Sequence, residues 1–507
     1  MGDSPVVRIT LGMFGPEQYH CPASDLLKAR GLRPRRKPAR KPEALETFLN
    51  GPFMDRAGSL DRCPDLSQGG WRRPVHDGVQ LWTSHALRMY GEAFPDHSGL
   101  RPAPAPWVYL HHGQAPDGVG SVDYRISAWG RCFESPDGRL RELRLPVKRL
   151  RTRSPVERAI AALVAAEGAS DERVEQVRVL QFALADGRVD PLFEGSRPEA
   201  LAVYRADGAP AVRALLNSRE YRPGPACATC AVAPVCPALE RTEGLLGITD
   251  RSRPRRTWSS TTGRTHSSCP ARGYLRGMRL PVDDHLERGA AAERGRAIHA
   301  FLAARHGLRP CTPCRPDVPD DWVPEGFLLP EEEQRLGAKL LRHHAEVCPL
   351  RVVGPSPEIR VEPRLTFDDT AADVVVLAEP DLLYRDRDGT LVWRETKTSG
   401  SDRPCRDLFD RYPQLALAVR LVGTGVLPGG TGGGRIELEV LQPGGVDLRI
   451  LDPSDPVTRA AAGATLREQV TAWHAEDRFE AVPGPECSRC EVARWCSARQ
   501  TPQEPDA

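Results

Sequence analysis

Two carboxylates and a lysine in the last third of the chain have the residue types and spacing of a metal centre. Residues 391–397 read as a strand, so Glu395 and Lys397, two positions apart, point to the same face. Residues 374–384 read as the preceding strand, and Asp381 lies at a bend in it, from which it can reach that face. Converging carboxylates are ligands that Mg²⁺ and Mn²⁺ prefer. The segment therefore predicts a site for a hard divalent cation.

Such a cation would polarise a phosphodiester and lower the pKa of a bound water. The carbonyl oxygen of Thr396 is a third candidate ligand, and Lys397 would position the water and stabilise developing charge. Of the 70 basic residues only six are lysines, and Glu395-x-Lys397 is the only acidic-x-lysine triplet in the chain. A compact ammonium suits this role better than a guanidinium fork. For an isolated triplet, the alternative is an ordinary exposed pair of opposite charges.

A histidine upstream is a further candidate ligand. Residues 293–302 have a helical pattern, with Ile298 and Leu302 on its apolar stripe and His299 beside that stripe. An imidazole in the metal shell would favour Mn²⁺ over Mg²⁺. A structural histidine at the edge of a core is the alternative. Glu358 or Glu362 is a candidate for one more acidic group.

The chain also repeats a cysteine motif. The pattern P-G-P-x-C-x-x-C-x-V-A-x-x-C occurs at 223–236 and again at 483–496, and each copy has a distant Cys-Pro upstream, at Cys21 and at Cys269. We interpret this as an internal duplication. The predicted domains are residues 1–245 and 257–507, and residues 246–256 form a linker.

Each half therefore carries four cysteines in a one-plus-three arrangement. Four thiolates suit either a tetrahedral zinc ion or an iron–sulfur cluster, and the asymmetric spacing favours the cluster over zinc or unligated core cysteines. Such a site would close a loop of more than 200 residues in each half. Six other cysteines lack this organisation. Among them, Cys311-x-x-Cys314 is at most half of a zinc knuckle, because it has no partner pair. The two predicted sets are Cys21, Cys227, Cys230 and Cys236, and Cys269, Cys487, Cys490 and Cys496.

The second half resembles a known family. Its motifs occur in the order Gly295-x-x-x-His299, Glu379-Pro380-Asp381, Glu395-Thr396-Lys397 and Tyr412-Pro413-Gln414-Leu415, framed by one cysteine before and three after. Over residues 257 to 500 this arrangement resembles the RecB-like branch of the PD-(D/E)XK nuclease superfamily. It looks most like the cluster-bearing members, the AddB nuclease domain and the CRISPR-associated four-cysteine exonucleases.

The resemblance implies both a fold and a set of roles. The expected fold class is α/β, with two tandem restriction-endonuclease-like domains, each a mixed sheet flanked by helices and closed by a four-cysteine site. A tyrosine that often follows the glutamine in that family is replaced by Ala418. The implied roles are metal binding by His299, Asp381 and Glu395, catalysis by Lys397, a substrate contact by Gln414, and a 4Fe-4S cluster in each half.

The first half lacks the metal ligands. Aligning its Asp137-Gly138 turn with Asp388-Gly389 places three other residues opposite Asp381, Glu395 and Lys397, namely Gly130, Arg144 and Pro146. We therefore expect an inactive copy that keeps its cluster, and His85 as the counterpart of His299. Its basic stretches, 33–41 and 144–153, could follow a phosphate backbone, or they could be ordinary solvated faces.

Composition limits the remaining possibilities. A formal net charge of +2 provides no global field that would require a nucleic-acid partner. No apolar run approaches the roughly 20 residues that span a bilayer, and no basic and apolar leader opens the chain. We therefore expect a cytoplasmic protein without membrane contact. No G-x-x-x-x-G-K-[ST] motif occurs, so any helicase or ATPase would be a separate subunit.

The predicted function is that of a metal-dependent DNA nuclease acting on single strands or ends in repair, recombination or phage defence. Mg²⁺ or Mn²⁺ would be its catalytic cofactor. The alternative is a non-catalytic iron–sulfur scaffold that binds nucleic acid within a helicase–nuclease complex. A cleavage assay with Mn²⁺ separates the two.

Overall fold

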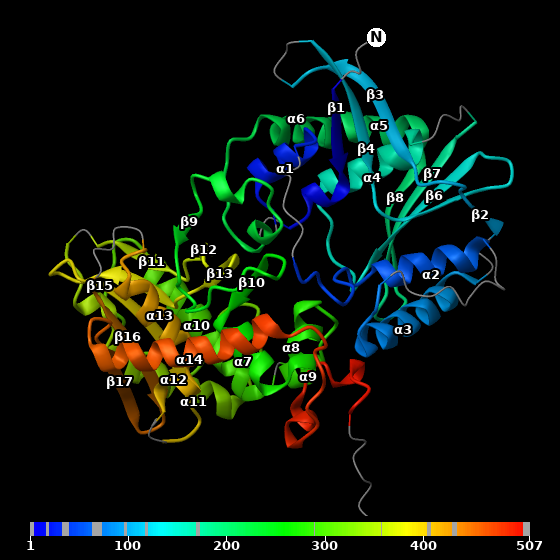
Figure 1. The fold of residues 1–507 in the computed structure, drawn as a ribbon. Coiled ribbons are helices and arrows are strands. Elements are labelled where there is room, and N and C mark those ends of the chain that lie inside the picture. Colours follow the sequence, from blue (N-terminus) through cyan, green and yellow to red (C-terminus); the bar gives the residue numbers. More distant parts are fainter. Residues whose placement is uncertain are drawn as a thin grey trace, which may run out of the picture.

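A computed structural model describes residues 5–16, 20–32, 40–62, 73–95, 99–116, 120–168, 173–287, 289–355, 357–402, 407–427 and 433–499. It shows a mixed α/β fold with several mixed sheets (Figure 1). The elements of the first half are β1 (Val6–Thr10), α1 (Pro22–Ala29), α2 (Gly51–Arg62), α3 (Asp77–Ala93), β2 (Arg101–Pro102), β3 (Val108–Gln114), β4 (Ser121–Ser127), β5 (Arg131–Glu134), β6 (Leu140–Val147), α4 (Pro155–Glu167), β7 (Gln176–Ala183), β8 (Val189–Ser196), α5 (Arg197–Val203), α6 (Ala209–Asn217) and β9 (Glu240–Thr242).

The elements of the second half are β10 (Arg256–Ser259), α7 (Ser260–Ser268), α8 (Pro270–Gly277), α9 (Asp284–Glu287), α10 (Ala290–Gly307), α11 (Glu331–Glu346), β11 (Ile359–Val361), β12 (Leu365–Asp369), β13 (Val374–Ala378), β14 (Leu382–Arg385), β15 (Leu391–Thr398), α12 (Leu408–Arg411), α13 (Pro413–Gly423), β16 (Arg435–Gln442), β17 (Gly445–Leu451) and α14 (Pro456–Ala475). Among the described helices, none is both long and apolar enough to cross a bilayer.

The larger sheets of the two halves have the same topology. The second-half sheet has the order β11-β14-β15-β16-β17, and only its β15–β16 pair is parallel. The first-half sheet has the order β2-β5-β6-β7-β8, and only its β6–β7 pair is parallel. A parallel pair needs a crossover connection, which α4 supplies in the first half and α12 with α13 in the second. Strand order, direction and crossover therefore agree position by position.

A smaller sheet accompanies each larger one. In the second half β13 pairs in parallel with β10 and antiparallel with β12, and in the first half β4 pairs in the same way with β1 and β3. The second small sheet has one more strand, because β9 from the predicted first domain pairs with β12. Figure 1 shows β9 reaching down from the first half to lie beside β12. The two halves thus share a sheet.

The apolar segment that precedes Asp381 differs from its prediction. We expected one strand over residues 374–384, but the structure divides it into β13 and β14, which belong to different sheets. The division falls at Glu379-Pro380-Asp381, where Pro380 has no N–H group to continue a ladder. The bend leaves Asp381 directly before β14, at the entrance to the β14–β15 hairpin.

The predicted linker is not a free connection. Leu246 is buried in the second-half core, and the carboxylate of Asp369 accepts hydrogen bonds from the backbone of Gly244 at 3.0 Å and of Leu246 at 2.7 Å. Arg255 pairs with Asp368, with 2.8 Å between nitrogen and oxygen. Buried acidic groups of β12 therefore anchor both ends of residues 246–256.

Each cysteine motif packs against the opposite half. Cys227 and Cys230 of the first motif share an apolar cluster with Val375 on β13. Trp495 of the second motif lies against Trp82 on α3, with ring centroids 5.0 Å apart. Gly78 permits this approach, because a Cβ atom there would lie 2.4 Å from the Trp495 carbonyl oxygen. The cores of the two halves are therefore interlocked.

Candidate active site and cysteine sites

Asp381, Glu395 and Lys397 lie together at the open end of the β14–β15 hairpin. The Lys397 ammonium donates to Glu395 Oε2 at 2.9 Å and to Asp381 Oδ2 at 3.4 Å. The backbone N–H of Thr396 donates to the same Asp381 oxygen at 2.6 Å. Glu395 is further fixed by the indole N–H of Trp393, at 3.0 Å. The strand alternation and the bend at Pro380 together place the two carboxylates next to the lysine.

His299 and Glu362 lie beside this group. His299, on α10, has its Nδ1 3.1 Å from Asp381 Oδ1. Glu362 lines the same hollow as His299, and its backbone N–H donates to the Asp381 carbonyl oxygen at 3.2 Å. Its φ angle of +43° is a strained conformation for a residue other than glycine. Glu358 pairs instead with Arg385, so Glu362 is the nearer acidic group.

The charges of Asp381, Glu395 and Lys397 shift one another's pKa values. Burial opposes ionisation of Asp381, but Lys397 and His299 together lower its pKa to about 2. Burial raises the pKa of Glu395, against the opposing effect of Lys397. Burial also disfavours the ammonium form of Lys397, yet Glu395 and Asp381 raise its pKa. The buried Glu395 and the half-buried Asp381 thus offer carboxylate oxygens of the kind that bind a divalent cation.

A cavity of about 890 Å³ opens onto these side chains. Asp381, Glu395, Lys397 and Gln414 line it, which places four of the five predicted catalytic residues on one surface. Other parts of its wall come from Arg264 on α7, from Arg364 before β12, and from residues 222–226 of the first half. A second, open hollow contains His299 and shares Arg264 and Lys397 with the first. The centre is therefore accessible from both sides of the lysine.

Residues 257–497 match the family model of the PD-(D/E)XK nuclease superfamily. The matched region, called the nuclease-family region below, contains the β14–β15 hairpin, α10 and the second cysteine motif. The match indicates a nuclease-type function that uses divalent metal ions and takes a nucleic-acid substrate.

Other comparisons add little. No curated protein matches the chain by sequence. Among solved structures, the crystal structure of SSO0001 is weakly similar, with 15% identity and a TM-score of 0.27, over 48% of this chain and 87% of that chain.

Four cysteines of the nuclease-family region gather around one small cavity. Its lining includes all four members of the predicted second set, Cys269, Cys487, Cys490 and Cys496. Backbone N–H groups of Val482 and Gly484 donate to the sulfurs of Cys269 and Cys487, at 3.5 and 3.4 Å. Such N–H···S bonds stabilise thiolates.

The first half repeats these contacts. Backbone N–H groups of Arg222 and Gly224 donate to Cys21 and Cys227, both at 3.4 Å. Burial raises the pKa of the Cys227 thiol, and the neighbouring Cys230, Cys21 and Cys236 raise it further. The backbone contact of each upstream cysteine segment is also equivalent, with Ala23 donating to Glu220 and Ala271 to Glu480.

The comparison of the two hairpins corrects the predicted alignment by one residue. Glu134 pairs with Arg141 in the first half, whereas Arg385 pairs with Leu391 in the second, so the first-half turn is one residue longer. Arg144 therefore corresponds to Arg394, and both face the helices on the same side of their sheet. The residues that correspond to Asp381, Glu395 and Lys397 are Gly130, Leu145 and Val147. All three side chains lack metal-binding groups.

The basic stretch at 144–153, for which phosphate binding and a solvated face were the two alternatives, has several of its cations paired within the protein. Arg144 is buried, and it pairs with Glu142 at 2.6 Å. Lys148 donates to the Arg279 carbonyl oxygen at 2.5 Å, and Arg149 pairs with Asp284. Lys148 and Arg149 thus join the two halves, whereas Arg144 is paired inside the first half. Most of the other basic stretch, 33–41, lies outside the described residues.

His85 has a structural role in the interface between the halves. Its Nε2 lies 2.8 Å from the carbonyl oxygen of Ala185, and its ring lies 5.4 Å from that of Trp495. Among the described residues, its ring nitrogens contact Ala185, Arg88 and Arg494 and not a carboxylate. It therefore shares with His299 only its position in a long helix.

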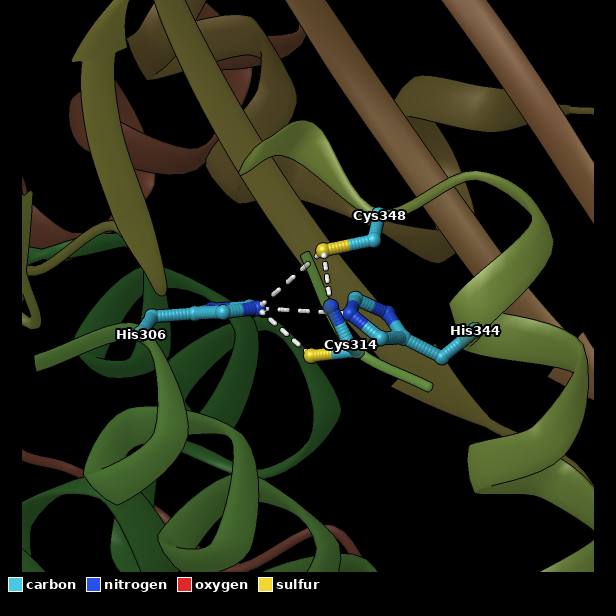
Figure 2. Close-up of side chains that lie close together, drawn as sticks. All are labelled: His306, Cys314, His344 and Cys348. Atoms are coloured by element: carbon cyan, nitrogen blue, oxygen red, sulfur yellow. Dashed lines mark hydrogen bonds between the residues drawn. The ribbon is translucent and has the colours of Figure 1, made fainter. Parts of the chain in front are cut away.

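Sequence reasoning missed one group of potential ligands. His306, Cys314, His344 and Cys348 are all buried, and one ligand atom from each lies within 4.8 Å of all the others. Figure 2 shows the four side chains pointing toward one centre. The group is compatible with a metal ion or an iron–sulfur site. Its sequence signal, a histidine four residues before a cysteine at the end of a helix, was present but had no visible partner.

Proposed function

We propose that the chain is a metal-dependent DNA nuclease whose active site lies on the β14–β15 hairpin. The observation that carries the proposal is the contact of Lys397 with both Glu395 and Asp381 at the wall of a large cavity. The family match over this region supports the same reaction class. The polar centre and the arginines on the cavity wall suit a polyanionic strand.

Each residue has a distinct proposed task. Asp381, Glu395 and the Thr396 carbonyl oxygen would hold Mg²⁺ or Mn²⁺, and His299 would complete the shell. A bound cation would supply Lewis acidity and a more acidic water. Lys397 would orient the attacking water and stabilise the charge that develops on the phosphate. Gln414, on the same cavity wall, would contact the substrate.

The proposed substrate is DNA, as single strands or ends. The hollow that contains His299 continues beyond Lys397 from the main cavity, so a strand can extend past the reacting phosphate on both sides. The first half contributes residues 222–226 to the cavity wall, and we infer that it positions substrate without cleaving it. Repair, recombination and phage defence are processes that need such an activity, and a separate helicase subunit would supply single strands.

We further propose that each cysteine set holds a 4Fe-4S cluster. Four thiols and backbone N–H···S bonds at equivalent positions of both halves support this assignment. Matching sheets and cysteine contacts likewise support an internal duplication with domains near 1–245 and 257–507. Iron and acid-labile sulfide in anaerobically purified protein would test the clusters. A colourless protein with zinc at these sites would contradict them.

The nuclease proposal is tested with the full chain, labelled single- and double-stranded DNA, and Mn²⁺ or Mg²⁺. We expect wild type to cleave DNA and Lys397→Ala to lose cleavage by about 10²–10⁴-fold while still binding DNA. The matched control is Lys339→Ala, because Lys339 is an exposed lysine on α11. A wild-type protein that binds DNA and leaves it intact would favour the scaffold alternative.

A further inference from the structure

The nuclease-family region contains a second group of ligands, distinct from the candidate active site and from both cysteine sets. His306 lies at the end of α10, His344 lies near the end of α11, Cys348 follows that helix, and Cys314 lies between the two helices. All four residues are buried, with side chains from three separate segments (Figure 2). This convergence needs a physical reason, because buried polar groups usually have a partner.

The distances between the ligand atoms suit one tetrahedral ion. Zinc, with Zn–N distances of about 2.0–2.1 Å and Zn–S distances of about 2.3 Å, would hold its nitrogens about 3.3 Å apart and each nitrogen about 3.5–3.6 Å from a sulfur. In the structure the two Nε2 atoms of His306 and His344 are 3.3 Å apart. His306 Nε2 lies 3.6 Å from Cys314 Sγ and 3.9 Å from Cys348 Sγ.

The contacts behind the ligands are those expected at a metal centre. His344 Nδ1 lies 2.7 Å from Glu439 Oε1, so its N–H donates to the carboxylate and its Nε2 lone pair faces the other ligands. The backbone N–H of Cys314 donates to Cys348 Sγ at 3.3 Å, which stabilises a thiolate. The buried Glu439 therefore fixes the tautomer of His344. The buried Cys314 N–H stabilises the Cys348 thiolate.

Charge balance also favours a divalent ion. Two thiolates and two neutral imidazoles carry a charge of −2, and a divalent cation makes the buried unit neutral. Binding would release the two thiol protons to solvent. An iron–sulfur cluster spreads its ligands over more than one iron, so four atoms this close together suit a single ion better.

We propose that His306, Cys314, His344 and Cys348 form a structural zinc site. The ion would join α10 and α11 to the segment between them and to β16, which carries Glu439. Four protein ligands leave no open position, so this zinc would not take part in catalysis directly.

The site lies directly behind the candidate active site. Glu439 also accepts hydrogen bonds from Thr396 Oγ1 at 3.1 Å and from Arg394 Nε at 3.3 Å. Thr396 in turn donates through its backbone to Asp381. On the helix side, His299 and His306 are both on α10, two turns apart. If the proposed nuclease function holds, the zinc ion positions both His299 and Asp381.

The test measures metal content in the full-length protein. We expect Cys314→Ser and Cys348→Ser each to lose one zinc per chain by elemental analysis, with iron unchanged. The matched control is Cys311→Ser, because Cys311 is three residues from Cys314 but its sulfur lies 3.6 Å from the Leu308 carbonyl oxygen, outside the group. Equal zinc in all three variants would overturn the proposal.

A measurement on wild type keeps the proposal testable if the serine variants do not fold. X-ray absorption at the zinc edge should give a first shell of two sulfurs and two nitrogens. A shell of four sulfurs, or one of oxygen and nitrogen alone, would overturn the assignment, as would a Cys314–Cys348 disulfide in the intact protein. Neither result depends on cleavage, so a failed nuclease proposal would leave the zinc result unaffected.

Discussion

The β5–β6 and β14–β15 hairpins have the same place in equivalent sheets but different interiors. In the second half, Glu395 and Lys397 meet Asp381 at a cavity. In the first half the corresponding residues are Gly130, Leu145 and Val147, and Leu145 is buried in an apolar core. The shared sheet topology therefore does not require the candidate metal centre. The topology fixes where the hairpin lies, and a few side chains decide whether it can bind a cation.

The first half has also lost the space for the missing acid. A Cβ atom on Gly130, which corresponds to Asp381, would lie 2.6 Å from the Arg144 carbonyl oxygen. No side chain fits there unless the backbone moves. The difference between the two hairpins therefore lies in the backbone packing and not in one side chain alone.

The largest expected effect is the loss of cleavage when a carboxylate beside the β14–β15 hairpin is removed. Asp381→Asn should lower Mn²⁺-dependent cleavage on the order of 10⁴-fold, because it removes a cation ligand and the charge beside Lys397. Single-turnover assays would measure the loss. Asp388→Asn, in the exposed turn of the same hairpin, is the control. Cleavage that survives Asp381→Asn would assign activity to the first half or to another site.

The next largest effect is a difference in stability between variants at one equivalent position of the two cysteine motifs. Trp495 is 2% exposed in the interlocked core, whereas Val235, its counterpart, is 76% exposed. Trp495→Ala should therefore lower the free energy of unfolding by about 3–5 kcal/mol. Val235→Ala should change it by less than about 0.5 kcal/mol. Denaturant titration of both variants would measure the difference, and equal losses would contradict the asymmetry.

A smaller effect is expected from rebuilding the acid in the first half. Gly130→Asp should lower the free energy of unfolding by about 1–3 kcal/mol, because the new side chain overlaps the backbone of β6. It should add no cleavage activity. Gly91→Asp is the control, since Gly91 is exposed on α3 and nothing lies within 4 Å of a Cβ there. A stable Gly130→Asp protein would show that the hairpin can move.

The smallest effect concerns the two helical histidines. His299→Gln should weaken apparent Mn²⁺ affinity by about tenfold and reduce the preference for Mn²⁺ over Mg²⁺, because a nitrogen ligand is lost. Metal titrations of the cleavage rate would measure both. His85→Gln should leave the metal dependence unchanged, since that ring faces Trp495 and the Ala185 carbonyl oxygen. A loss in both variants would indicate a general effect on the fold.

Local patterns predicted the parts of the molecule that depend on neighbours in sequence. The strand over residues 391–397 and the helix around His299 were expected, and the structure has them as β15 and α10. The placement of Glu395 and Lys397 on one face follows from strand geometry alone. Asp381 is expected to reach that face because of the bend that precedes it, whereas the role of Gln414 rests on the family resemblance.

Other features depend on tertiary structure. The one-residue difference between the two hairpin turns changes which side chains correspond, and sequence alignment alone gave Arg144 the wrong counterpart. The four candidate zinc ligands come from the ends of two helices and from the segment between them, so they form no compact sequence motif. Cys311-x-x-Cys314 looked like half of a knuckle, but only Cys314 joins the group. The fold, and not the sequence spacing, determines which residues lie beside Cys314.

Because the cores of the two halves are interlocked, dividing the chain between them would expose apolar surface on both fragments. A fragment that begins near residue 257 would lose β9 from its small sheet and expose Trp495 and its apolar neighbours to water. The complementary fragment would uncover Trp82 and the surface of Cys227 and Cys230. Separate expression of either piece should give aggregation-prone protein, whereas co-expression of both should allow them to reassociate. Each half would thus serve as a permanent folding partner of the other.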